Sequence, residues 1–444
     1  MPITQLNQTI TKKNLLSYAL PTIIGLLFTS AYTIIDGMFV ANFIHTHALA
    51  AINIVFPLIM FVVAIAMMMA TGGSAVIARK LGENALSEAR SIFSFLVMIL
   101  SLFSLLLCAI NLGFLEPLLH LLGANAVIYP YAHTYAIWTF LSVPFAMIGV
   151  FFQILFITAG KTKLALISTV IGGVINIILD YVLIVLFDLG ISGAAIATGL
   201  GYCVPFIVGL HYFGQTRSTQ LHFIKPKWHW RELWETCANG ASEMVVNLSQ
   251  AVVTILLNIT MMRLAGEVGI AAITIILYGQ TFLTAAFMGY ATGIAPIVSF
   301  NFGKKNQKRI AQIFRFSHHV IFFTALVAAS FGMIFAEPLV RLFSEPTSEI
   351  FALSVTGFRY SALAFLFMGF NIFGSAFFTA LSNGKTSAFI ALMRTFIFQV
   401  MMIVLCATFF GLNGVFFALP LAEAAGLLVT YACFKKHHPT LRLI

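Results

Sequence analysis

The fold is decided by the stretch between residues 48 and 77, which reads ALAAINIVFPLIMFVVAIAMMMATGGSAVI and contains no charged side chain. As an α-helix, about 30 residues rise roughly 45 Å, which exceeds the roughly 30 Å hydrocarbon core of a bilayer. A segment in lipid must satisfy its backbone hydrogen bonds internally, which favours a helix. The stretch therefore predicts a transmembrane helix.

The rest of the chain has the same character. Of its 444 residues, 60% are hydrophobic and 9% are charged, whereas soluble proteins carry about 25% charged residues. The alternating strands of a membrane barrel are not seen. We expect an all-α membrane protein with twelve spans, at residues 15–43, 48–77, 91–114, 130–158, 163–187, 191–214, 234–261, 268–298, 311–335, 351–380, 386–410 and 412–434.

The same stretch contains one copy of an internal repeat. Thr71-Gly72 recurs 221 residues later as Thr292-Gly293, and Ala50-Ala51-Ile52 recurs as Ala271-Ala272-Ile273. Six spans per half return the chain to the same face of the membrane. We therefore expect two parallel six-helix lobes related by pseudo-two-fold symmetry, an arrangement that suits alternating access. The expected domains are an N-lobe (1–214), a cytoplasmic linker (215–232) and a C-lobe (233–444).

Positive charges are distributed unequally between the two faces. All but three of the 24 Lys and Arg residues are assigned to loops or helix ends on the face of the N-terminus, the exceptions being Arg263, Arg341 and Arg359. Under the positive-inside rule, this indicates a bacterial inner-membrane protein with both termini in the cytoplasm. Topology accounts for the net charge of +10, so no nucleic-acid partner is expected. The basic, tryptophan-containing linker is expected to rest on membrane lipids.

Four carboxylates lie within the spans, where isolated charges are costly and usually functional. Asp36 and Asp180 each lie about seven residues from the outer ends of their spans, at similar depths. Asn176 is one turn from Asp180, and Thr198 reaches the same level from the sixth span. We expect these four residues to form a site for Na⁺, or for a proton held by the coupled acids. Alternatively, each aspartate could hydrogen-bond to neighbouring helices separately.

The other two acids are Glu243 and Glu423. Glu243 shares a helix face with Asn247 and Gln250, so we expect these three to face a central cavity and attract a cationic substrate. Glu243 could also stabilise the inner end of its helix, and Glu423 admits a functional and a structural interpretation equally. Aromatic and methionine side chains suit flat cations. Three such residues complete the predicted substrate cavity: Tyr32, Tyr181 and Met67.

Taken in order, these features resemble the multidrug and toxic compound extrusion (MATE) family. The resemblance covers essentially the whole chain. It is carried by Tyr32-Thr33-Ile34-Ile35-Asp36, by Ala48-Leu49-Ala50-Ala51, by Ile175-Asn176-Ile177-Ile178-Leu179-Asp180, and by Gly190-Ile191-Ser192-Gly193-Ala194-Ala195. It implies a V-shaped pair of lobes that export cationic, amphipathic drugs in exchange for H⁺ or Na⁺.

The resemblance also assigns residues. It carries an N-lobe cation site onto Asp36, Asn176, Asp180 and Thr198, the same four that helix depth collects. Some members have a C-lobe ion site with acids in spans 7 and 10. Glu243 fits the first position, but the tenth span offers Asn371 in place of an acid.

We therefore expect a monomeric secondary antiporter for multidrug efflux and antibiotic resistance, with no enzymatic activity, no cofactor and no metal site apart from Na⁺ at those four residues. A flippase for a lipid-linked sugar is the alternative within transport. It would need a basic central cavity, and few basic residues are assigned to the spans. A channel would pass ions passively, and an enzyme would need a catalytic cluster that the sequence lacks. No phosphate-binding loop is found, so ATP is not the expected energy source.

Overall fold

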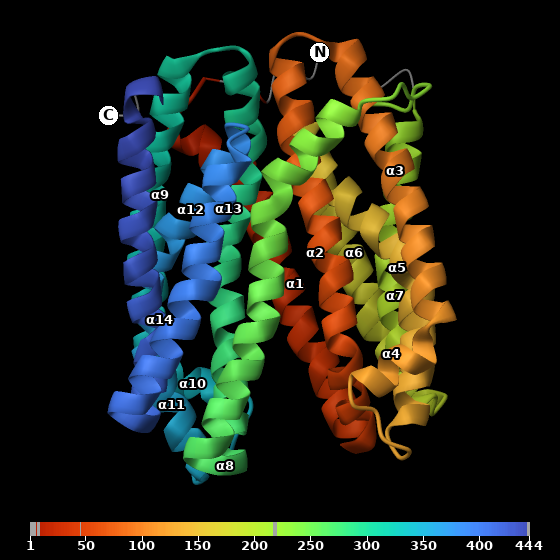
Figure 1. Cartoon of the computed structure of the whole chain (residues 1–444), viewed down its shortest axis with the longest axis vertical. Coiled ribbons are helices and arrows are strands. Elements are labelled where there is room, and N and C mark those ends of the chain that lie inside the picture. Colours follow the sequence, from red (N-terminus) through yellow and green to blue (C-terminus); the bar gives the residue numbers. More distant parts are fainter. Residues whose placement is uncertain (1–5, 7–8, 45, 216–219, 442–444) are drawn as a thin grey trace.

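The computed structural model describes Leu6 and residues 9–44, 46–215 and 220–441, and every regular element in these residues is helical. The first half forms one group of helices, coloured red to yellow-green in Figure 1. They are α1 (Lys12–Phe43), α2 (Thr46–Gly82), α3 (Leu86–Gly113), α4 (Leu115–Leu121), α5 (Tyr129–Thr158), α6 (Thr162–Asp180), the π-helix η1 (Tyr181–Leu186) and α7 (Gly190–Gly214).

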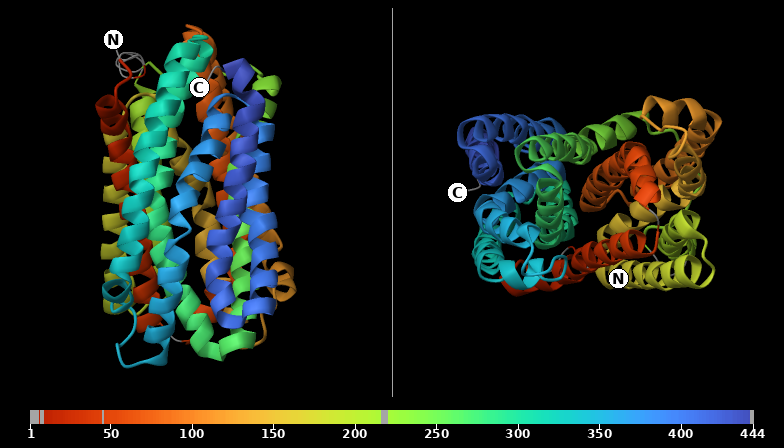
Figure 2. Two further views of the ribbon diagram at one scale, coloured as in Figure 1. Left: turned by 90° about the vertical axis from the view of Figure 1, so that its left-hand side faces the viewer. Right: turned by 90° about the horizontal axis from the view of Figure 1, so that it is seen from below.

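The second half forms the other group, coloured green to blue. It comprises α8 (Trp230–Gly303), α9 (Gln307–Ile334), α10 (Ala336–Val340), α11 (Glu349–Ala362), α12 (Phe365–Ala380), α13 (Gly384–Leu392), the π-helix η2 (Met393–Ile397) and α14 (Phe398–Leu441). Seen from the end opposite the termini, the two groups lie side by side, with α1 and α2 at the boundary (Figure 2). We call them the N-lobe and the C-lobe. Helix α8 begins at Trp230, two residues before the predicted end of the linker.

The all-α fold of twelve spans is confirmed, but several spans are joined or broken. Helix α8 has 74 residues, about 110 Å at 1.5 Å per residue, and crosses twice. The predicted connection at 262–267 is helical except at Gly266 (φ 61°, ψ −147°), a conformation that only glycine adopts readily. Gly411 (φ 59°, ψ −140°) separates the last two spans in the same way.

The tenth span, predicted as one helix, is broken. Helices α11 and α12 meet at an angle of 54°. The N–H groups of Leu363 and Ala364 donate to carbonyls three residues back, at 3.3 and 3.0 Å. This tightens the last turn of α11 and redirects the chain.

The backbone preserves the repeat that the sequence contains. Asn84 and Lys305 both have positive φ, at 61° and 56°, and so do Gly190 and Gly411, at 53° and 59°. Each pair is separated by the 221 residues found in the sequence. The tight turns are therefore conserved between the lobes in position and in conformation.

The lobes touch at the end that carries both termini and the linker, which we call the basic end. A Cβ on Gly82 would overlap the carbonyl oxygen of Phe300, and a Cβ on Gly303 would overlap that of Arg79. Phe300 lies 221 residues after Arg79, so the two contacts are related by the pseudo-two-fold axis. Backbones can approach this closely only because glycine has no side chain.

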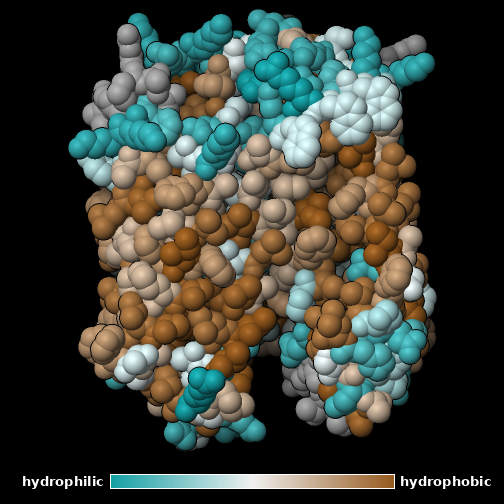
Figure 3. Space-filling model, viewed as in Figure 1, coloured by the Kyte–Doolittle hydropathy of each residue, from teal (hydrophilic) through white to brown (hydrophobic). Residues whose placement is uncertain are grey.

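One ion pair also joins the lobes at this end. Arg79 of α2 contacts Glu235 of α8 at 2.6 Å and donates to the Ser382 hydroxyl at 3.1 Å. At the opposite end a cleft separates the lobes, and on the face shown a hydrophobic band lies between the two polar ends (Figure 3). The structure is therefore closed at the basic end and open at the other.

We expect Gly82→Ala to destabilise this closure. The added methyl group forces apart two backbones, and overpacking of this kind costs about 1–3 kcal/mol. A lower melting temperature in detergent would report the effect. Gly113→Ala, at a glycine with no neighbouring atom within 4 Å, is the matched control and should melt like the wild type. Equal melting of both variants would contradict the assignment.

We expect Arg79→Gln to shift the lobes toward opening at the basic end. Loss of the two inter-lobe contacts should cost the closed state about 1–2 kcal/mol, a shift of roughly 5- to 30-fold. Distances between spin labels on the two lobes would measure it. Lys80→Gln is the control, because Lys80 pairs with Glu83 and Glu88 of its own lobe. A similar response in both variants would show that Arg79 does not hold the closure.

Candidate functional site

Two carboxylates meet inside the N-lobe. Asp36 lies on α1, and Asp180 is the last residue of α6, where the chain passes into the π-helix η1. The side chains interact directly, and Asp180 has no exposed surface. Within the described residues, neither Asp180 oxygen nor one Asp36 oxygen has a hydrogen-bond donor. These acceptors therefore require a cation or a proton.

Glycines on α6 bring these side chains together. A Cβ on Gly173 would lie 2.6 Å from the Phe28 ring and 2.7 Å from the Tyr32 ring of α1. A Cβ on Gly172 would lie 2.8 Å from the Gly201 carbonyl oxygen of α7. Without side chains at these positions, α6 packs tightly between α1 and α7. That packing brings Asp180 to α1.

The other two predicted ligands also lie together, Asn176 on α6 and Thr198 on α7. The Asn176 amide donates to the Thr198 hydroxyl at 3.5 Å, and the Asn176 Oδ1 atom has no donor among the described residues. Asn176 is one turn from Asp180 on α6. The structure thus collects all four residues where α1, α6 and α7 meet. Carboxylate, amide and hydroxyl oxygens are ligands that suit a hard cation.

Tyrosines surround the acid pair. Tyr32, Tyr135, Tyr202 and Tyr278 all lie close enough to Asp36 to interact with it electrostatically. Sequence analysis missed Tyr202, although it follows Thr198 by one helical turn. Tyr278 belongs to α8 of the C-lobe, and a Cβ on Gly37 would lie 3.3 Å from its hydroxyl. The acid pair therefore lies at the boundary between the lobes.

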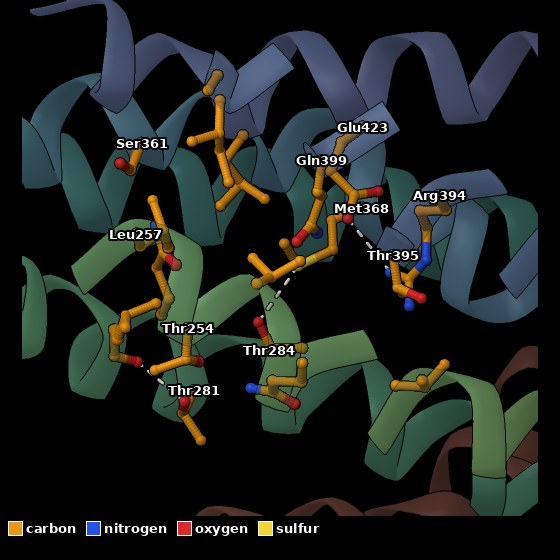
Figure 4. A pocket seen from close by; sticks show the side chains of 18 of the residues that line it. Thr254, Leu257, Thr281, Thr284, Ser361, Met368, Arg394, Thr395, Gln399 and Glu423 are labelled. Carbon is orange, nitrogen blue, oxygen red and sulfur yellow. Dashed lines mark hydrogen bonds and ion pairs between the residues drawn. The ribbon is translucent and has the colours of Figure 1, made fainter. Parts of the chain in front are cut away.

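A second candidate site is a cavity of about 210 Å³ in the C-lobe. Its walls come from α8 on one side and from α12, η2 and α14 on the other (Figure 4). Two predicted substrate-cavity residues, Glu243 and Gln250, line it. Apart from Arg394 and Glu423, the other lining residues are aliphatic or carry thioether, hydroxyl or amide groups.

The cavity contains a buried ion pair that sequence analysis did not find. The Arg394 guanidinium of η2 contacts the Glu423 carboxylate of α14 at 3.3 Å (Figure 4). The Asn371 amide donates to the other Glu423 oxygen at 2.8 Å, and the Thr430 hydroxyl donates to the Asn371 Oδ1 atom at 2.9 Å. Assigning Arg394 to the basic face was wrong, because it is 7% exposed within the C-lobe. The available signal was that Arg394 lies inside the predicted eleventh span (386–410) and that an acid, Glu423, lies inside the twelfth (412–434).

The remaining predicted substrate-cavity residues are dispersed. Tyr32 lies beside the N-lobe acids. Asn247 donates to the Glu243 backbone carbonyl at 2.8 Å, one turn back on α8, and does not line the C-lobe cavity. Tyr181 is 49% exposed, and Met67 is partly buried on α2. Two of the six residues therefore line the C-lobe cavity, and Tyr32 lies beside the N-lobe acids. One substrate cavity shared by all six stays a prediction, as does a substrate role for Asn247, Tyr181 and Met67.

Comparison with known proteins gives consistent matches. A family model described as MatE matches residues 21–182 and again residues 244–405, which independently supports the duplication. The multidrug export protein MepA of Staphylococcus saprophyticus is 24% identical, covering 94% of this chain and 93% of that protein. MepA of Staphylococcus haemolyticus is 25% identical, covering 93% and 90%.

Solved structures share the fold. The structure described as a MATE protein in complex with MaL6 has a TM-score of 0.94 at 20% identity, covering 100% of this chain and 99% of that one. The structure described as the outward-facing conformation of a multidrug resistance MATE family transporter has a TM-score of 0.93 at 21% identity, with the same coverage.

We expect Asp180→Asn to raise the melting temperature. A buried carboxylate next to a second acid, without donors, is costly to fold, and an amide removes the charge and supplies a donor to Asp36. The gain should be about 1–3 kcal/mol. Asp188→Asn, the same change on an exposed loop residue with φ of 51°, should leave it unchanged. A lower melting temperature for Asp180→Asn would show that Asp180 has a structural role.

Proposed function

Because the chain belongs to the multidrug and toxic compound extrusion (MATE) family, we propose that it is a secondary active antiporter that exports cationic, amphipathic compounds in exchange for H⁺ or Na⁺. The main support for the proposal is the Asp36–Asp180 pair, whose buried oxygens have no donor in the part of the chain that the structure describes. An entering cation or proton supplies what these oxygens lack. The coupling ion is the only cofactor proposed.

Neutralising the acid pair changes the balance between the two states of the lobes. An inward-moving unit charge contributes about 2.3 kcal/mol per 100 mV of membrane potential. Coupling requires the ion to favour one state over the other. The hydroxyl of Tyr278, in the C-lobe, lies beside Gly37 and close to Asp36, so movement of the lobes would change the surroundings of the acids. This contact links the charge of the N-lobe site to the position of the other lobe.

Alternating access then follows from the two ends of the molecule. The cleft opposite the basic end admits the ion and releases the substrate, and separation of the Gly82 and Gly303 contacts opens the basic end. The positive-inside rule supports a basic end in the cytoplasm, with both termini there, and a place in the bacterial inner membrane. One chain holds both lobes and both candidate sites, which supports a monomeric transporter in contact with membrane lipids.

The C-lobe cavity supports cationic rather than anionic substrates. Its lining includes two carboxylates and one guanidinium, and the guanidinium is already paired with Glu423. No free cation among the lining residues is available to an anionic headgroup. A flippase for a lipid-linked sugar is therefore less favoured than a drug exporter.

We expect Asp36→Asn and Asp180→Asn each to abolish ion-driven efflux. Each change removes one of the two carboxylates that hold the coupling ion. Ethidium efflux from proteoliposomes, with pH and Na⁺ gradients imposed separately, measures this and identifies the ion. Asp188→Asn is the matched control and should transport like the wild type. Full gradient-driven efflux by the Asp36→Asn/Asp180→Asn double variant would refute the coupling role.

A further inference from the structure

The charges of the C-lobe cavity do not cancel. Its lining contains three ionisable side chains, Glu243, Arg394 and Glu423. We propose that Arg394 sets the charge selectivity of this cavity. Because Arg394 neutralises Glu423, Glu243 is the one carboxylate in the lining without a paired cation. The cavity therefore binds organic cations with one positive charge and excludes those with two. This inference rests on the proposed export of cations, and it specifies that the exported cation carries a single positive charge.

Arg394 pairs with Glu423 because Glu423 is held in place. The Asn371 amide fixes one carboxylate oxygen, and the Thr430 hydroxyl fixes that amide. Gly426, one turn after Glu423, provides the space: a Cβ there would lie 3.0 Å from the Asn371 Nδ2 atom and 3.3 Å from the Arg394 Cγ atom. The charge of Arg394 also acts on Glu243, but the ion pair within contact distance is with Glu423.

The Arg394–Glu423 pair borders the cavity and does not lie in a closed core. Arg394 lines the cavity although it is only 7% exposed, and its Nε atom has no acceptor among the described residues. It also lies in the π-helix η2, and π-turns inside α-helices are frequent at functional sites. A purely structural ion pair would be expected to satisfy all its polar atoms.

The rest of the lining cannot neutralise a second charge. None of the 24 lining residues is aromatic, so cation–π contacts do not contribute. The other polar lining residues are uncharged, and they include Gln250, Thr284 and Gln399. Glu243 can balance one positive charge, and a second would remain unpaired in a site that is largely apolar, which is unfavourable. The cavity therefore selects ligands by their net charge more than by their shape.

The test uses two nearly isosteric ligands that differ by one charge, 1-methyl-4-phenylpyridinium (+1) and methyl viologen (+2). Equilibrium binding to the purified full chain in detergent, without any ion gradient, gives a ratio of dissociation constants. The wild type should favour the monocation. Arg394→Gln leaves two free carboxylates and should shift the ratio toward the dication at least tenfold. Glu243→Gln should weaken the binding of both.

Two further variants separate charge from structure. Arg394→Gln/Glu423→Gln has the wild-type net charge and should restore the wild-type ratio, whereas a pair needed only for folding would not be restored. Gln399→Glu adds a free carboxylate without disturbing the pair, so it should also favour the dication, even if Arg394→Gln fails to fold. An unchanged ratio in folded Gln399→Glu or Arg394→Gln would overturn the proposal.

The readout also distinguishes this inference from the proposed antiport. The binding assay uses no ion gradient, so loss of antiport alone leaves the ratio measurable, and Asp188→Asn, on an exposed loop outside the C-lobe cavity, should bind both ligands like the wild type. Binding of both ligands with no dependence on Arg394 would contradict only the charge-selection role. Binding of neither ligand to the wild type would contradict this inference and cation recognition by the C-lobe together.

Discussion

The central physical constraint is the burial of two acids in an apolar medium. Asp180 has no exposed surface, interacts with Asp36, and offers oxygens that no described donor satisfies. Such a pair is stable only when a positive charge or a proton reaches it. The glycines of α6 enforce the arrangement, because they let this helix pack against α1 and α7 without side chains between. Helix packing in the N-lobe therefore keeps the two acids buried and close together.

In the C-lobe, a buried carboxylate is neutralised in a different way. The 221-residue offset places Leu257 at the position of Asp36, and Glu423 at the position of Tyr202. The C-lobe acid that is ion-paired, Glu423, is therefore on another helix, and Arg394 neutralises it. Duplication preserved the backbone, including the positive-φ turns, while the chemistry of the two interiors diverged. The acids of the N-lobe have oxygens without a donor among the described residues, whereas Glu423 of the C-lobe is paired with Arg394.

The lobes communicate where they touch. The reciprocal contacts of Gly82 and Gly303 hold the backbones at the basic end, and Arg79 adds an ion pair across the boundary. The hydroxyl of Tyr278, in the C-lobe, lies beside Gly37 of the N-lobe, close to Asp36. The N-lobe acids therefore lie near a residue of the opposite lobe. Close backbone packing favours two discrete arrangements over a continuous range, because the contacts are either made or lost.

The sequence by itself determined the all-α membrane fold, the twelve spans and the duplication. It also predicted that Asp36, Asn176, Asp180 and Thr198 lie at one level, because hydropathy, offset and depth along a helix are properties of position in the chain. Only the tertiary structure decided that Arg394 faces Glu423, that Asn371 holds that acid, and that Asn247 bonds to its own helix. These outcomes depend on how each helix is rotated and bent. The π-turn of η2 and the break between α11 and α12 alter that rotation, and packing between distant segments sets it.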